Sequence, residues 1–295
     1  MIDVFSQLLV SGLLIGGLYA LITVGLTLVF GVLRVVNFAH GEYLTIAMYC
    51  TYFLFSQYAI DPFIASLLVV PFLFVLGILT ERVLIRPTLN APHVVQVFVT
   101  FALSLWIQNL LLVLFTSDFR SVRIAYATAS MQVGSIYVSK MRLAAFVIAI
   151  GAAIGLTLFL KYSYLGNAIQ ATAQDRRSAR LVGIDVDKVY AITFGLGCAL
   201  VGVAGVLLTP LFPMNPYTGA DMILIAFVIV VMGGLGSVSG AVLGGLTVGI
   251  IESFTGYFLG GEMKQFVYFV FFMLVLAVRP TGFFGKRGSE VMEVT

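Results

Sequence analysis

The sequence predicts an all-α integral membrane protein, a polytopic helix bundle of about eight membrane segments, one of them broken or re-entrant. Of its 295 residues, 61% are hydrophobic and only 10% are charged, whereas soluble domains carry about 25% charge. The mean hydropathy is +1.10, and long stretches contain no charged residue. A soluble domain is therefore excluded, and so is a disordered chain, which lacks apolar residues.

Uncharged stretches define the expected spans, because a helix crossing the hydrocarbon core needs about 20 apolar residues. The stretches near or above this length are residues 4–33, 43–60, 62–80, 87–117, 143–160, 189–220 and 222–251. A shorter one, 265–278, spans if Glu262 and Lys264 lie at its end and extend toward water. Backbone groups must be paired in lipid, so these segments are helices or strands of a closed barrel. Continuous apolar character, without the alternation of barrel strands, favours helices.

The stretch 222–251 contains the sequence GGLGSVSG at 233–240. Glycine and serine there should break the helix near the middle of the membrane. Two half-helices forming a re-entrant pair and one kinked span both fit this pattern. Glycine pairs four residues apart favour close packing of helices; examples are Gly12–Gly16, Gly236–Gly240 and Gly245–Gly249.

Orientation follows from lysine and arginine, which concentrate in short loops on the inner side. If the N-terminus is outside and 222–258 enters and returns, the inner side holds 11 of the 16 basic residues. If 222–251 is a single span, the C-terminal tail lies outside and the division is eight against eight. We therefore prefer the re-entrant arrangement. The chain then forms one transmembrane domain, 1–288, with a short tail, 289–295.

Two polar loops stand out. The outer loop, 118–142, is β-like at 131–139 and suits contact with a soluble outer partner. The inner loop, 162–188, contains 166–184, which reads GNAIQATAQDRRSARLVGI. This segment is rich in alanine and lacks proline, so a short helix is expected. It is either a solvated helix at the membrane surface or a lever that fits a cytoplasmic motor protein. After it, Asp185 or Asp187 can cap the next helix.

The sequence offers little for catalysis, metals or nucleic acid. The net charge of +3 is too small to indicate a nucleic-acid partner. His40 and His93 are far apart in the sequence, with no further histidine to complete a metal site. Cys50 and Cys198 lie in apolar stretches, where a cysteine acts as a small buried hydrophobic residue. No GxxxxGK[ST] phosphate loop and no HExxH pair occur. We therefore expect no catalytic residues, no metal ligands and no directly bound cofactor.

Several short motifs together resemble one family. The alanine-x-aspartate core at 173–175, followed by Gly183 and Ile184, is similar to the coupling loop of ABC importer permeases. NFAHGE at 37–42 resembles a signature of the branched-chain amino acid permeases, LivH type. Further motifs match in order: Glu81-Arg82, Arg86-Pro87, Tyr162-Ser163 with Gly166, Asn215-Pro216-Tyr217, GGLGS at 233–237 and Pro280-Thr281-Gly282. The resemblance covers about 8–285.

That resemblance implies a transport subunit in the cytoplasmic (inner) membrane rather than an enzyme. Its expected partners are a second permease of the LivM type, two cytoplasmic ATPase subunits that use the ATP, and a soluble substrate-binding protein. The expected cargo is a branched-chain or related amino acid. The coupling residues implied are Gly166, Ala173, Asp175, Gly183 and Ile184.

Six residues are candidates for the translocation path or its gate. The charge arrangement puts Asn37, His40 and Glu42 at the inner mouth, where they either line the path or make ordinary helix-turn contacts, with Glu42 in a first helical turn. Asn215 is either part of a rigid outer turn or a contact for delivered substrate. Gly234 and Gly236 lie at the expected midplane break, where half-helix ends can meet a carboxylate.

Three other functions fit parts of the pattern less well. A stand-alone secondary transporter needs acidic residues inside the spans, and these are almost absent. An intramembrane enzyme needs a catalytic pair that the spans lack. The same ATP-driven machine can carry urea or short amides, since nothing in the chain selects leucine over urea.

Overall fold

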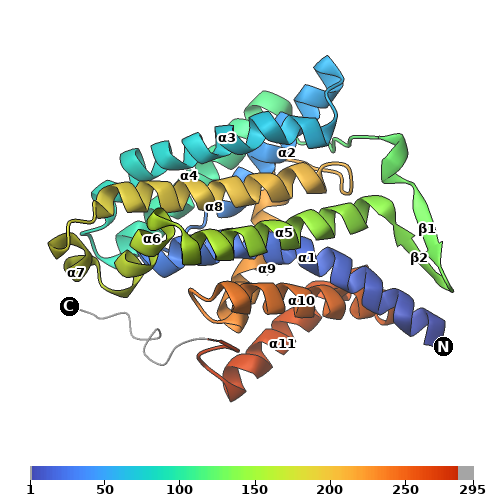
Figure 1. The fold of residues 1–295 in the computed structure, drawn as a ribbon. Coiled ribbons are helices and arrows are strands. Elements are labelled where there is room, and N and C mark those ends of the chain that lie inside the picture. The colour runs from blue at the N-terminus through green and yellow to red at the C-terminus, as the bar shows by residue number, and fades with distance from the viewer. Residues whose placement is uncertain (1, 285–295) are drawn as a thin grey trace.

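Long helices running in alternating directions make up most of the protein, in a computed structural model that describes residues 2–284 (Figure 1). The long helices are α1 (Ile2–Leu33), α2 (His40–Tyr58), α3 (Pro62–Thr80), α4 (His93–Phe115), α5 (Lys140–Tyr162), α8 (Val186–Leu208), α9 (Thr218–Gly233), α10 (Val238–Phe258) and α11 (Lys264–Val278). Two short helices, α6 (Tyr164–Gln174) and α7 (Arg176–Leu181), join α5 to α8. Seven helices in the described part are long and apolar enough to cross a membrane, and α9 is a shorter apolar helix. This is a polytopic all-α membrane protein, as predicted.

The two ends of the bundle differ. One end carries the start of α1 and a hairpin of β1 (Ser130–Val133) and β2 (Ile136–Ser139), within the loop predicted to be β-like. Gln7 of α1 fixes this hairpin by bonding both backbone groups of Tyr137. The opposite end carries α6 and α7, and the end of α11 lies toward that side (Figure 1). We call these the hairpin end and the loop-helix end.

The stretch 222–251 forms two helices rather than one kinked span. Helix α9 ends at Gly233, α10 begins at Val238, and the two pack side by side in opposite directions. The chain therefore enters and returns over this stretch, as the charge count favoured. Lys286, Arg287 and the tail 289–295 lie outside the described residues.

Glycines bring α1 and α10 into backbone contact. A Cβ placed on Gly12 would lie 2.7 Å from Cα of Ile250, and one on Gly16 would lie 2.8 Å from the carbonyl oxygen of Gly245. Side chains at these positions would separate the helices. The predicted close packing at Gly12, Gly16, Gly245 and Gly249 is therefore present, because these residues let two backbones meet.

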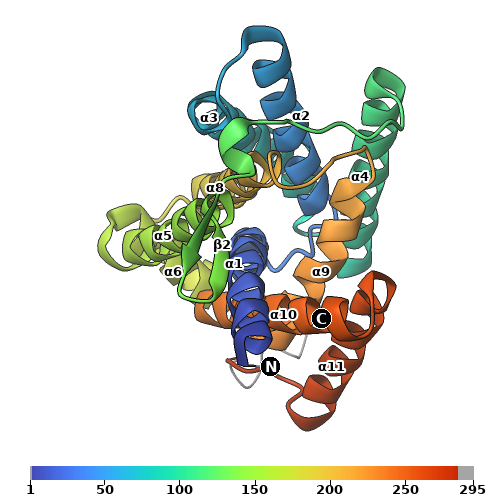
Figure 2. The same cartoon turned by 90° about the vertical axis from the view of Figure 1, so that its right-hand side faces the viewer.

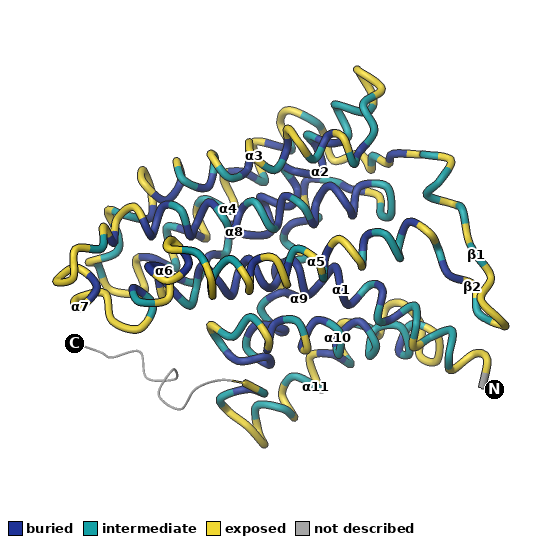
Figure 3. The backbone as a smooth tube through the Cα atoms, in the orientation of Figure 1, coloured by how far each residue is buried: buried dark blue, intermediate teal, exposed yellow. Residues whose placement is uncertain are grey.

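Burial divides the helices into a centre and a rim. Helix α1 lies in the middle of the end-on view, with α5, α8, α9 and α10 around it (Figure 2). Most of α1 and α8 is buried, whereas α4 and α11 expose long apolar faces (Figure 3). On α4, for example, Val113 is 82% exposed and Phe98 is 65% exposed. Such faces suit lipid or a second membrane subunit.

Candidate functional site

A group of polar side chains lies deep in the bundle where α2 begins. After α1 the chain turns back at Arg34, whose φ is +56°, and α2 starts at His40. His40 Nε2 donates a hydrogen bond to the carbonyl oxygen of Ile22, at 3.1 Å. Because Ile22 precedes the end of α1 by 11 residues, this contact lies about 16 Å in from that end.

Glu42 gives an independent measure of the depth of this group. Its Oε1 accepts a hydrogen bond from the Ser104 hydroxyl at 3.1 Å, and Ser104 is the central residue of the 23-residue helix α4. The motif of Asn37, His40 and Glu42 therefore lies near the middle of the spans, not at the inner mouth as predicted. The charged and polar residues resemble a surface loop in sequence, but the chain between α1 and α2 folds back into the bundle.

Helix α9 also begins at this depth, and its first turn meets the first turn of α2. A Cβ on Gly219 would lie 2.6 Å from Thr45 Oγ1 and would collide with the backbone of Gly41. Asn215 organises the start of α9, because its Oδ1 accepts bonds from Tyr217 N and from the Thr218 hydroxyl. The side chain of Asn215 therefore serves the turn in this structure. Two helix N-termini, each a positive dipole end, converge inside the bundle. Most of their first-turn N–H groups already bond to carbonyl oxygens of the preceding turns.

Three buried polar atoms in the α2 motif have no hydrogen-bond partner. They are Asn37 Nδ2, His40 Nδ1 and Glu42 Oε2, and all three residues are fully buried. Within residues 2–284, Glu42 also forms no ion pair. A buried carboxyl without a cation is costly unless something pairs with it. This motif therefore has unused capacity to bind a polar group.

An arginine that the sequence analysis missed lies between this motif and the hairpin end. Arg120 follows α4, pairs through its backbone with Met214 just before α9, and packs over the rings of Tyr52, Phe53 and Phe115. Its guanidinium also donates to the carbonyl oxygen of Phe115 at 3.0 Å. Arg120 therefore ties the segments before α9 and after α4 to the last turns of α2. In the sequence it is only one of several basic residues in an outer loop.

The glycine turn between α9 and α10 lies elsewhere. Gly236 packs against Gly31 in the last turn of α1, so the break is near the loop-helix end and not at the midplane as predicted. Gly234 and Gly236 take positive φ values of +101° and +81° to make the turn. The segment after α11 covers it, since Phe283 N donates to the carbonyl oxygen of Met232. The half-helices that meet at the midplane are α2 and α9 instead.

The segment predicted as one short helix is two helices. Asp175 interrupts it in an extended conformation and caps α7 by accepting bonds from Arg177 N and from the Ser178 hydroxyl. These hydrogen bonds, with that of Ser178 foremost, lower the pKa of the Asp175 carboxyl. Asp185 caps α8, as expected, by accepting from Lys188 N.

Helix α6 packs into the bundle along one face, whereas α7 is held mainly through Ala179, which is buried, and Arg180, which pairs with Asp187. Ala168, Ile169 and Thr172 of α6 are buried against neighbouring helices, and Ala173 packs at the edge of that core. Gly166 approaches α5 so closely that a Cβ would lie 2.6 Å from the Leu160 carbonyl oxygen.

Apart from Ala179, the residues of α7 and the turn after it are exposed. Leu181 and Val182 are 83% and 76% exposed, and the turn closes through Gly183, φ +86°, and Ile184. The loop thus presents an exposed apolar and basic tip on a fixed base.

Ion pairs connect this tip to the turn between α3 and α4. Arg180 of α7 pairs with Asp187 at 3.3 Å. Arg86 then donates to the backbone carbonyl of Asp187 and forms a fork with the buried carboxylate of Glu81, at 2.8 Å for the shorter contact. Glu81 therefore pairs with Arg86 and not with the adjacent Arg82.

Comparison with known proteins identifies the family. The model of the family "branched-chain amino acid transport system / permease component" matches residues 8–276. The chain belongs to this permease family. It is 34% identical, over 97% of both chains, to the high-affinity branched-chain amino acid transport system permease protein LivH of Escherichia coli K12. It is also 34% identical, over the same share, to BraD of Pseudomonas aeruginosa, and 28% identical to a probable LivH of Methanocaldococcus jannaschii over 87% of this chain and 83% of that one. No solved structure matches significantly.

In this permease the candidate residues form two separate groups. The structure brings Asn37, His40 and Glu42 together at the starts of α2 and α9, with Asn215 in the turn that leads into α9. The loop residues 166–184 lie at the loop-helix end, and Gly234 and Gly236 lie toward that end as well. No cluster of three or more His, Cys, Asp or Glu side chains suited to a metal ion occurs in the described part of the permease.

Proposed function

We propose that this permease is the membrane-spanning subunit of an ATP-driven importer in the cytoplasmic membrane, with branched-chain or related amino acids as cargo. The family match over residues 8–276 carries this proposal, and relatives named as branched-chain amino acid permeases support the cargo. The subunit itself binds no cofactor in this proposal. Partner ATPases bind and hydrolyse the ATP, in keeping with a sequence that has no phosphate-loop motif.

The two ATPase subunits dock at the loop-helix end in this proposal. The exposed tip of α7, with Leu181, Val182 and three arginines, suits insertion into a groove of a soluble partner. A second permease of the LivM type lies alongside in the membrane. A soluble binding protein delivers the amino acid at the hairpin end, where the loop 118–142 is exposed.

Movement of α7 would be passed on by its anchors. Helix α6 packs on α1, α5 and α8, and the pairs Arg180–Asp187 and Arg86–Glu81 connect the tip to α8 and to the turn after α3. ATP binding shifts the permease between two states only through contacts that differ between those states. The α7 contacts are the ones exposed to the ATPases.

The starts of α2 and α9 form the amino-acid path in this proposal. A positive helix N-terminus suits the carboxylate of an amino acid. The free Oε2 of Glu42 suits its ammonium group. Together they match a zwitterion better than they match an uncharged amide such as urea.

Reconstitution in proteoliposomes tests the function. The chain, its permease partner and the two ATPases should take up labelled leucine only with ATP and binding protein present. Urea in place of leucine, with the same proteins, is the matched control and should not be taken up. Leucine uptake by this chain alone, driven by an ion gradient, would contradict the proposal.

A further inference from the structure

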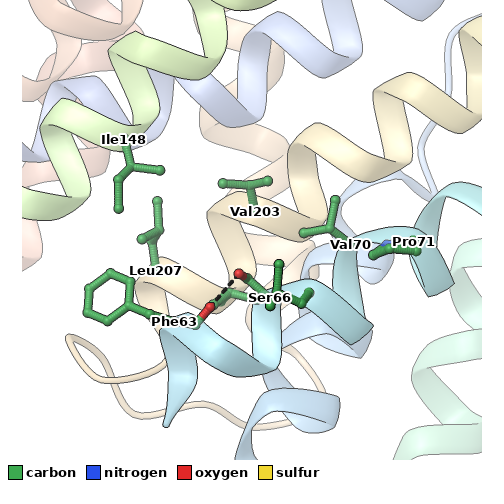
Figure 4. A pocket seen from close by; sticks show the side chains of 9 residues that line it. Phe63, Ser66, Val70, Pro71, Ile148, Val203 and Leu207 are labelled. Carbon is green, nitrogen blue, oxygen red and sulfur yellow. Dashed lines mark hydrogen bonds between the residues drawn. The ribbon is translucent and has the colours of Figure 1, made fainter.

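An apolar groove crosses the surface of the bundle between α3, α5 and α8, away from the polar motif (Figure 4). Its volume is about 360 Å³, within the range of about 300–1,000 Å³ typical of small-molecule sites. The side chains that define its walls are Phe63, Leu67 and Val70 of α3, Ile148 of α5, and Val203 and Leu207 of α8. Ser66 also lines the groove, but its hydroxyl bonds to the Phe63 carbonyl oxygen. The groove therefore offers apolar surface and no free polar partner.

A second cavity lies beside the groove, toward the hairpin end. It has a volume of about 680 Å³, and its lining includes Arg123, Ser139, Arg142, Pro210 and Leu211. Helix α5 contributes to both cavities. Leu207 in the last turn of α8 lines the groove, and Pro210 and Leu211, just after α8, line the second cavity. On α5, for example, Arg142 precedes Ile148 by six residues, about 9 Å along the axis.

An aromatic contact lies between the two cavities. The ring centroids of Phe63 and Tyr126 are 6.0 Å apart. Ala125 and Ala127, the chain neighbours of Tyr126, line the second cavity. The apolar groove therefore opens next to a polar, basic cavity.

The basic charge in this second cavity is not neutralised by the protein. Neither Arg123 nor Arg142 forms an ion pair within residues 2–284. The nearby carboxylate of Asp61 accepts bonds from Phe63 N and the Tyr126 hydroxyl instead. Burial and that hydrogen bond raise the pKa of Tyr126, so its hydroxyl stays a donor. Two guanidinium groups are left to attract an anion.

We propose that these neighbouring cavities together bind an anionic phospholipid. Its phosphate lies between Arg123 and Arg142, and one acyl chain fills the groove between Phe63 and Leu207. Arginine holds phosphate through paired hydrogen bonds. The neighbouring residues Ile64 and Leu68 are about 60% exposed, so the groove opens onto a face that needs lipid.

The charge pattern favours lipid over other occupants. An amino acid in transit needs a polar partner within the groove, and none is free there. A helix from a second permease would cover the apolar groove but would leave the two arginines without an anion. A phospholipid satisfies both cavities at once.

Native mass spectrometry of the assembled transporter tests this. The complex is released from nanodiscs that contain equal amounts of phosphatidylglycerol and phosphatidylcholine. We expect phosphatidylglycerol to be retained preferentially. Arg123→Gln with Arg142→Gln should lower that preference about tenfold, as loss of a charge-assisted hydrogen bond predicts. The matched control Lys140→Gln removes a charge at the start of α5 that does not line the cavity, and it should keep the preference.

The groove is tested separately. Ile148→Trp fills it and should reduce retention of both lipids, whereas Val147→Trp, on the adjacent exposed position, should not. Equal retention by the wild type, the double arginine variant and Ile148→Trp would overturn the proposal. So would displacement of the lipid by soluble glycerol phosphate, because the head group alone would then account for binding. Leucine transport is a separate readout, so failure here leaves the proposed function intact.

Discussion

At the scale of single residues, the unusual feature is a buried carboxyl with one bonded and one free oxygen. Ser104 satisfies Oε1 of Glu42, and Oε2 has no partner. An uncharged hydrogen bond adds about 0.5–1.5 kcal/mol and a charged one about 1.5–3 kcal/mol. Glutamine at position 42 keeps the bond to Ser104 and removes the charge.

Glu42→Gln should therefore raise the KM for leucine uptake about tenfold or more while the complex still assembles. Uptake measured in proteoliposomes, together with size-exclusion chromatography of the complex, checks this. Ser104→Ala is the matched control, because it removes the bond but keeps the charge, and it should have a smaller effect. Wild-type uptake by Glu42→Gln would show that the carboxylate does not contact the substrate.

The meeting of α2 and α9 depends on the absence of a side chain at Gly219. A larger residue there would run into Thr45 and the backbone of Gly41. We expect Gly219→Leu to cost about 1–3 kcal/mol, as for overpacking, and to lower the melting temperature of the purified complex. Gly151→Leu on α5 is the control, since a Cβ there meets nothing within 4 Å. Equal melting temperatures for the two variants would refute the close approach.

At the scale of elements, the cap at Asp175 divides the inner loop into a helix packed into the bundle, α6, and a mostly exposed one, α7. Local sequence signals could have located this division, because Ser163 and Asp175 are both good N-cap residues followed by helix formers. Alanine-rich composition pointed instead to one continuous helix. The spans themselves were predictable because a long apolar stretch is a property of the sequence alone.

Asp175→Ala should lower ATP hydrolysis coupled to leucine transport, whereas Asp175→Asn should keep most of it, because asparagine also caps helices. A carboxyl with a lowered pKa contributes stability above its ordinary pKa, and this is lost as the pH falls through the lowered value. Coupling should therefore not vary through this group near neutral pH. Equal coupling in the alanine and asparagine variants would argue against the cap.

At the scale of the whole molecule, the sequence could not reveal how deep in the membrane each polar motif and helix end lies. The motif 37–42 and the start of α9 each follow a stretch that re-enters the bundle, and re-entry depends on contacts between Gly41 and Gly219, far apart in the chain. Likewise, Gly234 and Gly236 marked a break correctly but not its level in the membrane. The orientation in the membrane was inferred from the distribution of basic residues, and this orientation can be tested directly.

Cysteine labelling in intact cells tests the orientation, in a background where Cys50 and Cys198 are replaced. Gln174→Cys at the loop-helix end should react with a membrane-impermeant maleimide only after the membrane is opened. Gln132→Cys on β1, at the other end, should react in intact cells and serves as the control. The reverse pattern would invert the topology and remove α7 from the reach of cytoplasmic ATPases.

The seam of glycines between α1 and α10 restricts how this transporter can change shape. Two backbones in direct contact cannot slide or rotate past each other without losing that contact, so the pair should travel as one rigid strut. Helix α4, by contrast, packs mainly on α2 and on the turn after α3. Alternating access would then come from tilting of α4 and its neighbours relative to the α1–α10 pair. A disulfide joining α1 to α10 should therefore leave transport undiminished.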